Sequence, residues 1–268
     1  MAPRGTRRRL SPARRFVGEI VRAARKVPSM PVARTMSVAA ITPLRHALAA
    51  RPSWTALLIK AYGLLCRERP PLRRAFVQWP TAHLYEHPCS VAAVSVEREW
   101  GGEPVVLGTR VTSPEDRAIP DIHAHLYRYK HAPILALEDF RASLFLGRLR
   151  QPLRGLVRWA ALDVSGAQRA RRLGTFLVSS YGSLGAEQLH PRSPLTTVLT
   201  FGPISANGTT VVKLVYDHRV LDGAYVARCL ARLEEILQED IRAELARLRA
   251  SSDPALRQPS ARSRADRA

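Results

Sequence analysis

The sequence is poor in cysteine, and it has no long apolar run. Its three cysteines, Cys66, Cys89 and Cys229, are far apart and odd in number. This argues against a disulfide framework or a structural zinc site and favours a reducing compartment. No apolar run reaches the ~18 residues of a membrane-spanning helix, and the N-terminus has no secretory-signal pattern. We therefore expect a cytoplasmic protein. Cys229, on the final predicted helix, is expected to pack in the protein core and not to act as a nucleophile.

Negative charge is also scarce. The chain has 42 lysines and arginines against 22 acidic residues, a formal net charge of +20, and only Lys26, Lys60, Lys130 and Lys213 are lysines. Such a charge favours anionic partners, although an arginine-rich genome explains it equally well. Nucleic-acid binding is disfavoured, because neither a zinc-finger spacing nor interleaved aromatic and basic residues accompany the charge.

Apolar periodicity predicts helices and strands between two disordered ends, a basic arm over residues 1–12 and a polar tail over 250–268. Between them we expect a single domain, residues 13–249. The predicted helices are 13–26, 41–66, 113–131 and 224–249, and the predicted strands are 89–96, 209–216 and those starting at Val105, Gly174 and Pro194. Asn207 and Gly208 predict a hairpin turn between the strand that starts at Pro194 and strand 209–216.

Two segments combine apolar spacing with many arginines. They are residues 13–26 and the amphipathic basic stretch 137–162, which Pro152 should kink or split. Packing of the apolar face on the core is one interpretation of each pattern. The alternative is contact of each segment with an anionic membrane surface or, for the second stretch, with a lipid-like substrate.

The segment VVKLVYDHRVLDGAYVARCL, residues 211–230, carries the clearest chemical signal. An apolar strand places His218 at its end, Asp222 stands where a helix N-cap belongs, and Gly223 eases the turn. Histidine changes its charge near neutral pH, so a histidine held by a strand end suits a general base. The alternatives are a turn histidine with satisfied hydrogen bonds and a purely capping aspartate.

DHRVLDG, residues 217–223, resembles the active-site signature of the acyltransferase catalytic domain of 2-oxo acid dehydrogenase complexes, with Asp217 at its first position. GTFLVSSYGSLG, residues 174–185, resembles the stretch in which that family has a serine that hydrogen-bonds the tetrahedral oxyanion. The resemblance assigns this role to Ser179, or to Ser180 if the register slips by one. AARKVPSMP resembles the segment of an arginine that pairs with the signature aspartate, which places Arg25 opposite Asp222.

The resemblance implies a chloramphenicol acetyltransferase-like fold, an α/β two-layer sandwich whose mixed β-sheet is flanked by helices. It also implies a homotrimer with active sites between subunits, where His218 of one subunit meets Ser179 of another. The acyl donor would be an acyl-coenzyme A, and the acceptor would be a thiol or a hydroxyl group. Asp222 would fix the loop, supported by Arg25, Asp217 and Gly223.

The sequence has no lipoyl domain or lipoyl-lysine hairpin, so we expect a bare catalytic domain without covalently attached lipoate. The stretch 137–173 is longer, more apolar and more basic than the family leads one to expect, which favours a small or lipid-like acceptor and permits peripheral membrane contact.

An inactive acyltransferase-fold scaffold on an anionic membrane is the alternative function. Two histidine pairs, His83 with His87 on one expected helix face and His123 with His125 near Asp121, lack a third ligand set, so no metal is expected.

Overall fold

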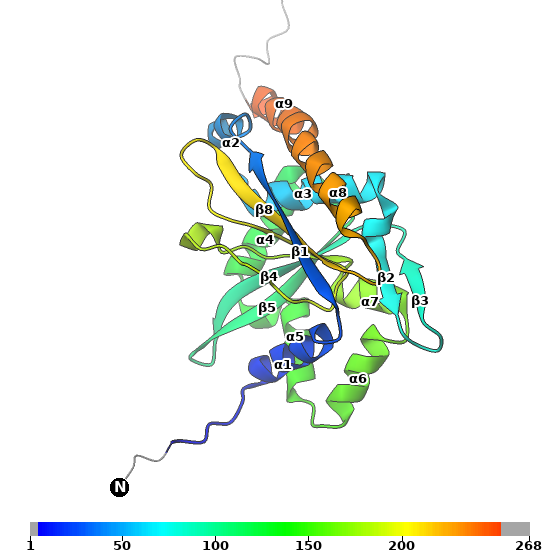
Figure 1. Cartoon of the computed structure of the whole chain (residues 1–268). Helices are drawn as coiled ribbons and strands as arrows, with labels where there is room; N and C mark the ends of the chain where they lie inside the picture. The colour runs from blue at the N-terminus through cyan, green and yellow to red at the C-terminus, as the bar shows by residue number, and fades with distance from the viewer. Residues whose placement is uncertain (1–4, 253–268) are drawn as a thin grey trace, which may run out of the picture.

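A six-stranded mixed sheet in the order β1-β8-β7-β6-β4-β5 organises the chain (Figure 1). The computed structural model describes residues 5–252, so the outer parts of the predicted arm and tail, 1–4 and 253–268, lie outside the described residues. The strands are β1 (Ser29–Ser37), β4 (Val91–Trp100), β5 (Glu103–Thr112), β6 (Phe176–Val178), β7 (Thr197–Phe201) and β8 (Thr209–Asp217). Strand β6 runs parallel to β4 and β7, and the other pairs are antiparallel. The predicted mixed sheet is therefore confirmed.

Helices cover this sheet and extend past its end. They are α1 (Pro12–Ala24), α2 (Thr42–Ala47), α3 (Trp54–Glu68), α4 (Ile119–His131), α5 (Glu138–Arg148), α6 (Leu153–Leu162), α7 (Gly166–Leu173), α8 (Gly223–Ile236) and α9 (Arg242–Ser252), with a π-turn over Leu237–Ile241. Helices α3 and α8 enclose the main core against the sheet, whereas α1 and α5 enclose a second cluster against β5. Helix α6 lies beside α1 at the same end of the molecule (Figure 1).

Strand β8 shows why the sheet positions the sequence motif. Its side chains Val212, Leu214 and Tyr216 alternate into the main core, and it pairs with β1 on one side and β7 on the other. Gly208 takes the positive φ of 73° that the hairpin before β8 requires. A strand held on both sides is rigid, so the turn that follows Asp217 starts from a fixed point.

Three local expectations need correction. The segment 41–66 forms two helices, because Ser53 caps a new helix by accepting a hydrogen bond from the backbone of Ala56. His83 and His87 do not share a helix face, since the segment around them forms β3 (His83–Glu86), which pairs with β2 (Arg74–Val77) in a small separate sheet. Strand β1 escaped prediction because Pro31 interrupts its pattern, yet an edge strand tolerates proline.

The basic stretch divides as predicted, with α5 before Pro152 and α6 after it. Phe140 and Leu144 pack in the second core cluster, while Phe145, Leu153 and Leu156 are exposed. Core packing therefore accounts for one side of the stretch and leaves an apolar side uncovered. Among residues 5–252, no helix is long and apolar enough to cross a membrane.

Candidate functional site

The turn between β8 and α8 is built around an ion pair whose carboxylate is buried. Asp217 is buried, and its carboxylate accepts hydrogen bonds from the backbone N–H of Arg219 at 3.0 Å and from its Nε and Nη2 at 2.9 and 2.6 Å. The Arg219 guanidinium also stacks 4.3 Å from the centre of the Phe76 ring. A bidentate pair of this kind fixes both direction and distance, so the chain between its two members is held firmly.

His218 lies between these two residues and is oriented at both ends. Its backbone N–H donates to the carbonyl oxygen of Pro28 at 3.1 Å, which ties the turn to the start of β1. Its ring Nδ1 lies 3.1 Å from the carbonyl oxygen of Leu221. Because a carbonyl oxygen only accepts, Nδ1 carries the proton, and the neutral ring keeps a free lone pair on Nε2. The side chain is 49% exposed, so the ring is accessible from solvent.

Asp222 and Gly223 follow at the start of α8. Asp222 is the N-cap residue, but its side chain makes no capping hydrogen bond; its Oδ1 lies 3.7 Å from His218 Nδ1, and 87% of the side chain is exposed. A Cβ on Gly223 would approach the Tyr216 hydroxyl to 3.1 Å, so the turn favours glycine. Arg25 is exposed at the end of α1, and within residues 5–252 of one chain no hydrogen bond or ion pair joins it to Asp222. Their pairing stays a prediction.

The two serines of the second motif have different surroundings. The Ser180 hydroxyl donates to the carbonyl oxygen of Phe201 at 2.7 Å and accepts from the backbone of Gly182 at 3.0 Å, so it supports the turn. Ser179 is held by its backbone, which donates to Leu199 at 3.1 Å. In the described part of the chain, no group hydrogen-bonds the Ser179 hydroxyl, which leaves that hydroxyl available as a donor.

One chain does not bring Ser179 and His218 together. Ser179 follows the end of β6, which is parallel to β7, while His218 follows the end of the antiparallel β8. Val178 is level with Leu199 and Leu214 across β7 and β8. The two side chains therefore start about 17 Å apart along the strands and about 10 Å across them, at opposite ends of the sheet's strands.

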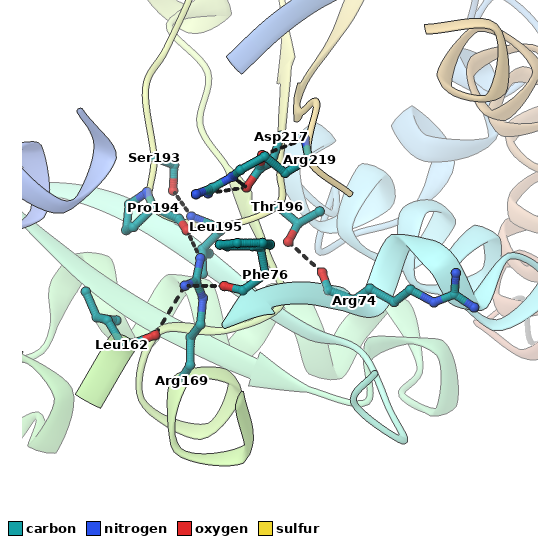
Figure 2. Close-up of polar contacts among 10 residues, drawn as sticks. All are labelled: Arg74, Phe76, Leu162, Arg169, Ser193, Pro194, Leu195, Thr196, Asp217 and Arg219. Carbon is teal, nitrogen blue, oxygen red and sulfur yellow. Dashed lines mark hydrogen bonds and ion pairs between the residues drawn. The ribbon is translucent and has the colours of Figure 1, made fainter. Parts of the chain in front are cut away.

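The structure adds residues that the sequence did not single out (Figure 2). Phe76 lies beneath Arg219. The buried Arg169 of α7 donates a hydrogen bond to the carbonyl oxygen of Phe76 in β2. Arg219 stood inside the quoted motif but received no role. Arg169 stands in a run with Arg171 and Arg172, and nothing in the local sequence marks it as the buried one.

Other candidate sites lose support. Among residues 5–252, no group of three or more His, Cys, Asp or Glu side chains is placed to hold a metal ion. His125 instead hydrogen-bonds Thr109 at 2.9 Å, and His123 accepts from the backbone of Ser53. Cys229 is buried on α8, and desolvation raises the pKa of its thiol, which disfavours the nucleophilic thiolate.

Comparison with known proteins adds the fold. Neither a protein-family model nor a curated protein matches the sequence. Among solved structures, the dihydrolipoamide acetyltransferase of Azotobacter vinelandii is 17% identical and superposes with a TM-score of 0.63, over 90% of this chain and 94% of that one. This chain has the dihydrolipoamide acetyltransferase fold.

Two further structures have the same acetyltransferase fold. The cubic core of a pyruvate dehydrogenase multienzyme complex is 17% identical, with a TM-score of 0.61 over 90% of this chain and 94% of that one. A truncated catalytic core of the 2-oxoacid dehydrogenase complex of Thermoplasma acidophilum is 15% identical, with a TM-score of 0.60 over 88% of this chain and 99% of that one. The fold expected from the DHRVLDG and GTFLVSS motifs is thus confirmed, at identities that establish the fold alone.

Proposed function

We propose that the protein is an acyltransferase that moves an acyl group from coenzyme A to a thiol or hydroxyl acceptor, with His218 as the general base. The observation that carries this proposal is the hydrogen bond from His218 Nδ1 to the Leu221 carbonyl oxygen. It places a proton on Nδ1, so that in the neutral ring Nε2 carries the lone pair that a base requires. The acetyltransferase fold supports the reaction class.

The reaction balances with residues of this chain alone. Nε2 of His218 takes the proton from the acceptor S–H or O–H as the acceptor attacks the thioester carbonyl. The Ser179 hydroxyl donates a hydrogen bond to the oxyanion of the tetrahedral intermediate. When the intermediate collapses, the C–S bond to coenzyme A breaks, and the leaving thiolate receives the proton from Nε2. Asp222 and the Asp217–Arg219 pair keep the turn in place and move no proton.

The fold supports a site shared between subunits. In one chain, His218 and Ser179 lie at opposite ends of the strands. They can therefore act on one substrate only if a second copy supplies one of them. The loop after Ser179 carries large apolar side chains that the chain leaves uncovered, Leu184 at 73% and Leu189 at 77% exposure. A neighbouring copy would cover such a surface. A closed homotrimer satisfies both requirements, with one site at each interface.

The Azotobacter enzyme offers a further parallel. A serine, a histidine and an asparagine were investigated there for their role in the catalytic mechanism, and the asparagine follows the histidine by four positions. Asp222 follows His218 by the same interval. We assign Asp222, whose exposed Oδ1 lies 3.7 Å from Nδ1, to the turn that presents His218 and not to proton transfer.

Release of free thiol from a panel of acyl-CoAs tests the proposal, with dihydrolipoamide and a lipid extract as acceptors. Wild type should release thiol with at least one pair, and His218→Ala should lower the rate about 100- to 10,000-fold at unchanged oligomeric state. His131→Ala, on an exposed part of α4, is the matched control and should keep the wild-type rate. Thiol release that survives in His218→Ala would refute the assignment.

The uncovered side of α5 and α6 favours a second candidate function. Phe145, Leu153 and Leu156 are exposed next to basic side chains, an arrangement that suits an anionic lipid surface. An inactive scaffold would co-sediment with anionic liposomes and transfer no acyl group. Liposome binding that coincides with His218-dependent transfer would instead place the enzyme at a membrane.

A further inference from the structure

Among residues 5–252, no carboxylate forms an ion pair with the buried guanidinium group of Arg169. Its residue is 5% exposed, and its two terminal nitrogens donate only to backbone carbonyl oxygens, those of Phe76 and Leu162 at 3.3 and 3.2 Å and that of Pro194 (Figure 2). Its Nε is buried and has no hydrogen-bond partner among the described residues. Burying an unpaired charge is costly, and such groups are normally paired or bound to a ligand.

Arg169 lines a cavity of about 330 Å³ beside the candidate site. This volume falls at the lower end of the range for small-molecule sites. Phe76, Trp159 and Leu162 form apolar walls, and Arg219, the residue next to His218, is part of the lining. The cavity therefore lies between α6, within the unusual stretch 137–173, and the turn that presents the candidate base.

The charges around the cavity favour an anion. Lys26, Arg169 and Arg219 line it, and Asp163 is the acidic residue of the lining. Arg219 is neutralised by Asp217, which leaves two cations against one carboxylate. Asp163 is in turn offset by a nitrogen of Arg158 at 3.9 Å.

Burial lowers the pKa of Arg169, and nearby Arg219 adds to this effect, while Asp163 and Asp217 oppose it only in part. A bound anion would relieve the cost that this shift expresses. The buried charge of Arg169 and the positive balance of the cavity lining thus favour the same class of ligand.

We propose that this cavity binds a carboxylate or phosphate group at the far end of a substrate whose reacting group lies at His218. The guanidinium group of Arg169 and the ammonium group of Lys26 hold the anion, and Phe76 and Trp159 flank the chain that links it to the reacting end. The inference rests on the proposed acyl transfer for its second half, and it narrows the unidentified acyl group or acceptor to one that carries an anion.

Calorimetric titration at low salt tests the cavity without any turnover. The probes are inorganic phosphate, glutarate and, as a neutral match to glutarate, glutaramide. Wild type should bind at least one of the two anions and not the diamide. Arg169→Gln should weaken binding about tenfold to a hundredfold, the range expected for a hydrogen bond to a charged group. Lys26→Gln, at the exposed rim, should weaken it about twofold to fivefold.

Arg172→Gln is the matched control. It removes the same charge from the same helix at an exposed position outside the cavity lining, so binding should remain as in wild type. If Arg169→Gln fails to fold, Lys26→Gln and the glutarate–glutaramide pair still decide. Equal binding of glutarate and glutaramide, no binding of either anion, or equal loss in Lys26→Gln and Arg172→Gln would overturn the anion site.

A kinetic comparison separates this inference from the proposed function. Succinyl-CoA and butyryl-CoA differ at the end of the acyl chain, as do acceptors with and without a carboxylate. If the anion belongs to a substrate, kcat/KM should favour the anionic member of one pair at least tenfold in wild type, and that preference should fall about twofold to fivefold in Lys26→Gln. Anion binding with no transfer would refute the acyl-transfer proposal and keep the anion site, whereas transfer with no anion preference and no anion binding would do the reverse.

Discussion

Replacing Glu19 by alanine is expected to detach α6 from α1 and to lower the thermal midpoint substantially. The Glu19 side chain is 2% exposed and stands at the centre of a cluster contributed by both helices. Its Oε1 accepts from Gln151 at 2.9 Å, Arg154 at 3.0 Å and Arg22 at 3.3 Å, and its Oε2 accepts from Arg158 at 3.0 Å. One carboxylate thus accepts hydrogen bonds from α1, from α6 and from the segment just before α6.

The cost follows from what the substitution leaves behind. Arg154 and Arg158 are each 13% exposed, so Glu19→Ala leaves two largely buried guanidinium groups without the carboxylate that they share; the remaining partners are the Leu149 carbonyl oxygen, 3.3 Å from Arg154, and Asp163, 3.9 Å from Arg158. Removing one partner of a buried ion pair costs about 3–5 kcal/mol. For a domain of about 250 residues, 1 kcal/mol moves the midpoint by about 2 °C, so a fall of about 6–10 °C is expected.

Differential scanning calorimetry at pH 7 and fixed protein concentration measures this effect. The matched control is Glu68→Ala, because Glu68 also pairs with an arginine, Arg232, but its side chain is 40% exposed. An exposed pair contributes about 0–1 kcal/mol, so the control should lose no more than about 2 °C. Equal shifts in the two variants would refute the claim that burial makes the Glu19 cluster strong. Lys26 follows α1 and Trp159 lies on α6, so Glu19→Ala should also weaken anion binding in the cavity.

Three further outcomes are expected. Ser179→Ala should lower kcat about 100- to 1,000-fold in the thiol-release assay, whereas Ser180→Ala, which loses the two hydrogen bonds that support the turn, should stay within a few-fold of wild type; the reverse order would exchange their roles. Asp217→Ala should cost about 1.5–3 kcal/mol in urea unfolding because it removes the hydrogen bonds between a buried carboxylate and Arg219, while Asp222→Ala, an exposed residue, should cost less than about 0.5 kcal/mol; similar losses would contradict the account of the turn. Burial tends to raise the pKa of Glu19, but the hydrogen bonds from Arg154 and Arg158 and the charge of Arg22 leave it below the usual value, so its stabilisation should be complete above about pH 4.3 and fade below that; a stability difference between wild type and Glu19→Gln that does not shrink in acid would contradict this.

The regular elements and the fold were largely predictable because their signals are local. The apolar alternation of β8, the hairpin at Gly208 and the break at Pro152 all lie within a few residues of the elements they determine. The separation of α2 from α3 was missed because the apolar pattern runs through Ser53, whose capping role depends on one hydrogen bond. The strand at His83 was missed because it is four residues long and pairs with a segment that shows no strand pattern of its own.

The candidate site was predictable only in part. The position of His218 at a strand end follows from the sequence, but its proton on Nδ1 depends on a carbonyl oxygen that only the folded turn supplies. The burial of Arg169 could not be predicted, since its environment comes from β2, α6 and the segment before β7, which are distant in sequence. Pairing of Arg25 with Asp222 stays a prediction that requires more than one chain.

The central claim is that His218 of one subunit and Ser179 of another act on the same acyl group. The most direct test is to mix His218→Ala and Ser179→Ala subunits under conditions that exchange them, and to measure thiol release with an active acyl-CoA and acceptor pair. In a randomly mixed trimer about a quarter of the sites regain both wild-type side chains, so activity should rise to about a quarter of the wild-type value. Activity that stays at the level of the separate variants, in samples shown by native mass spectrometry to contain mixed oligomers, would contradict the shared site.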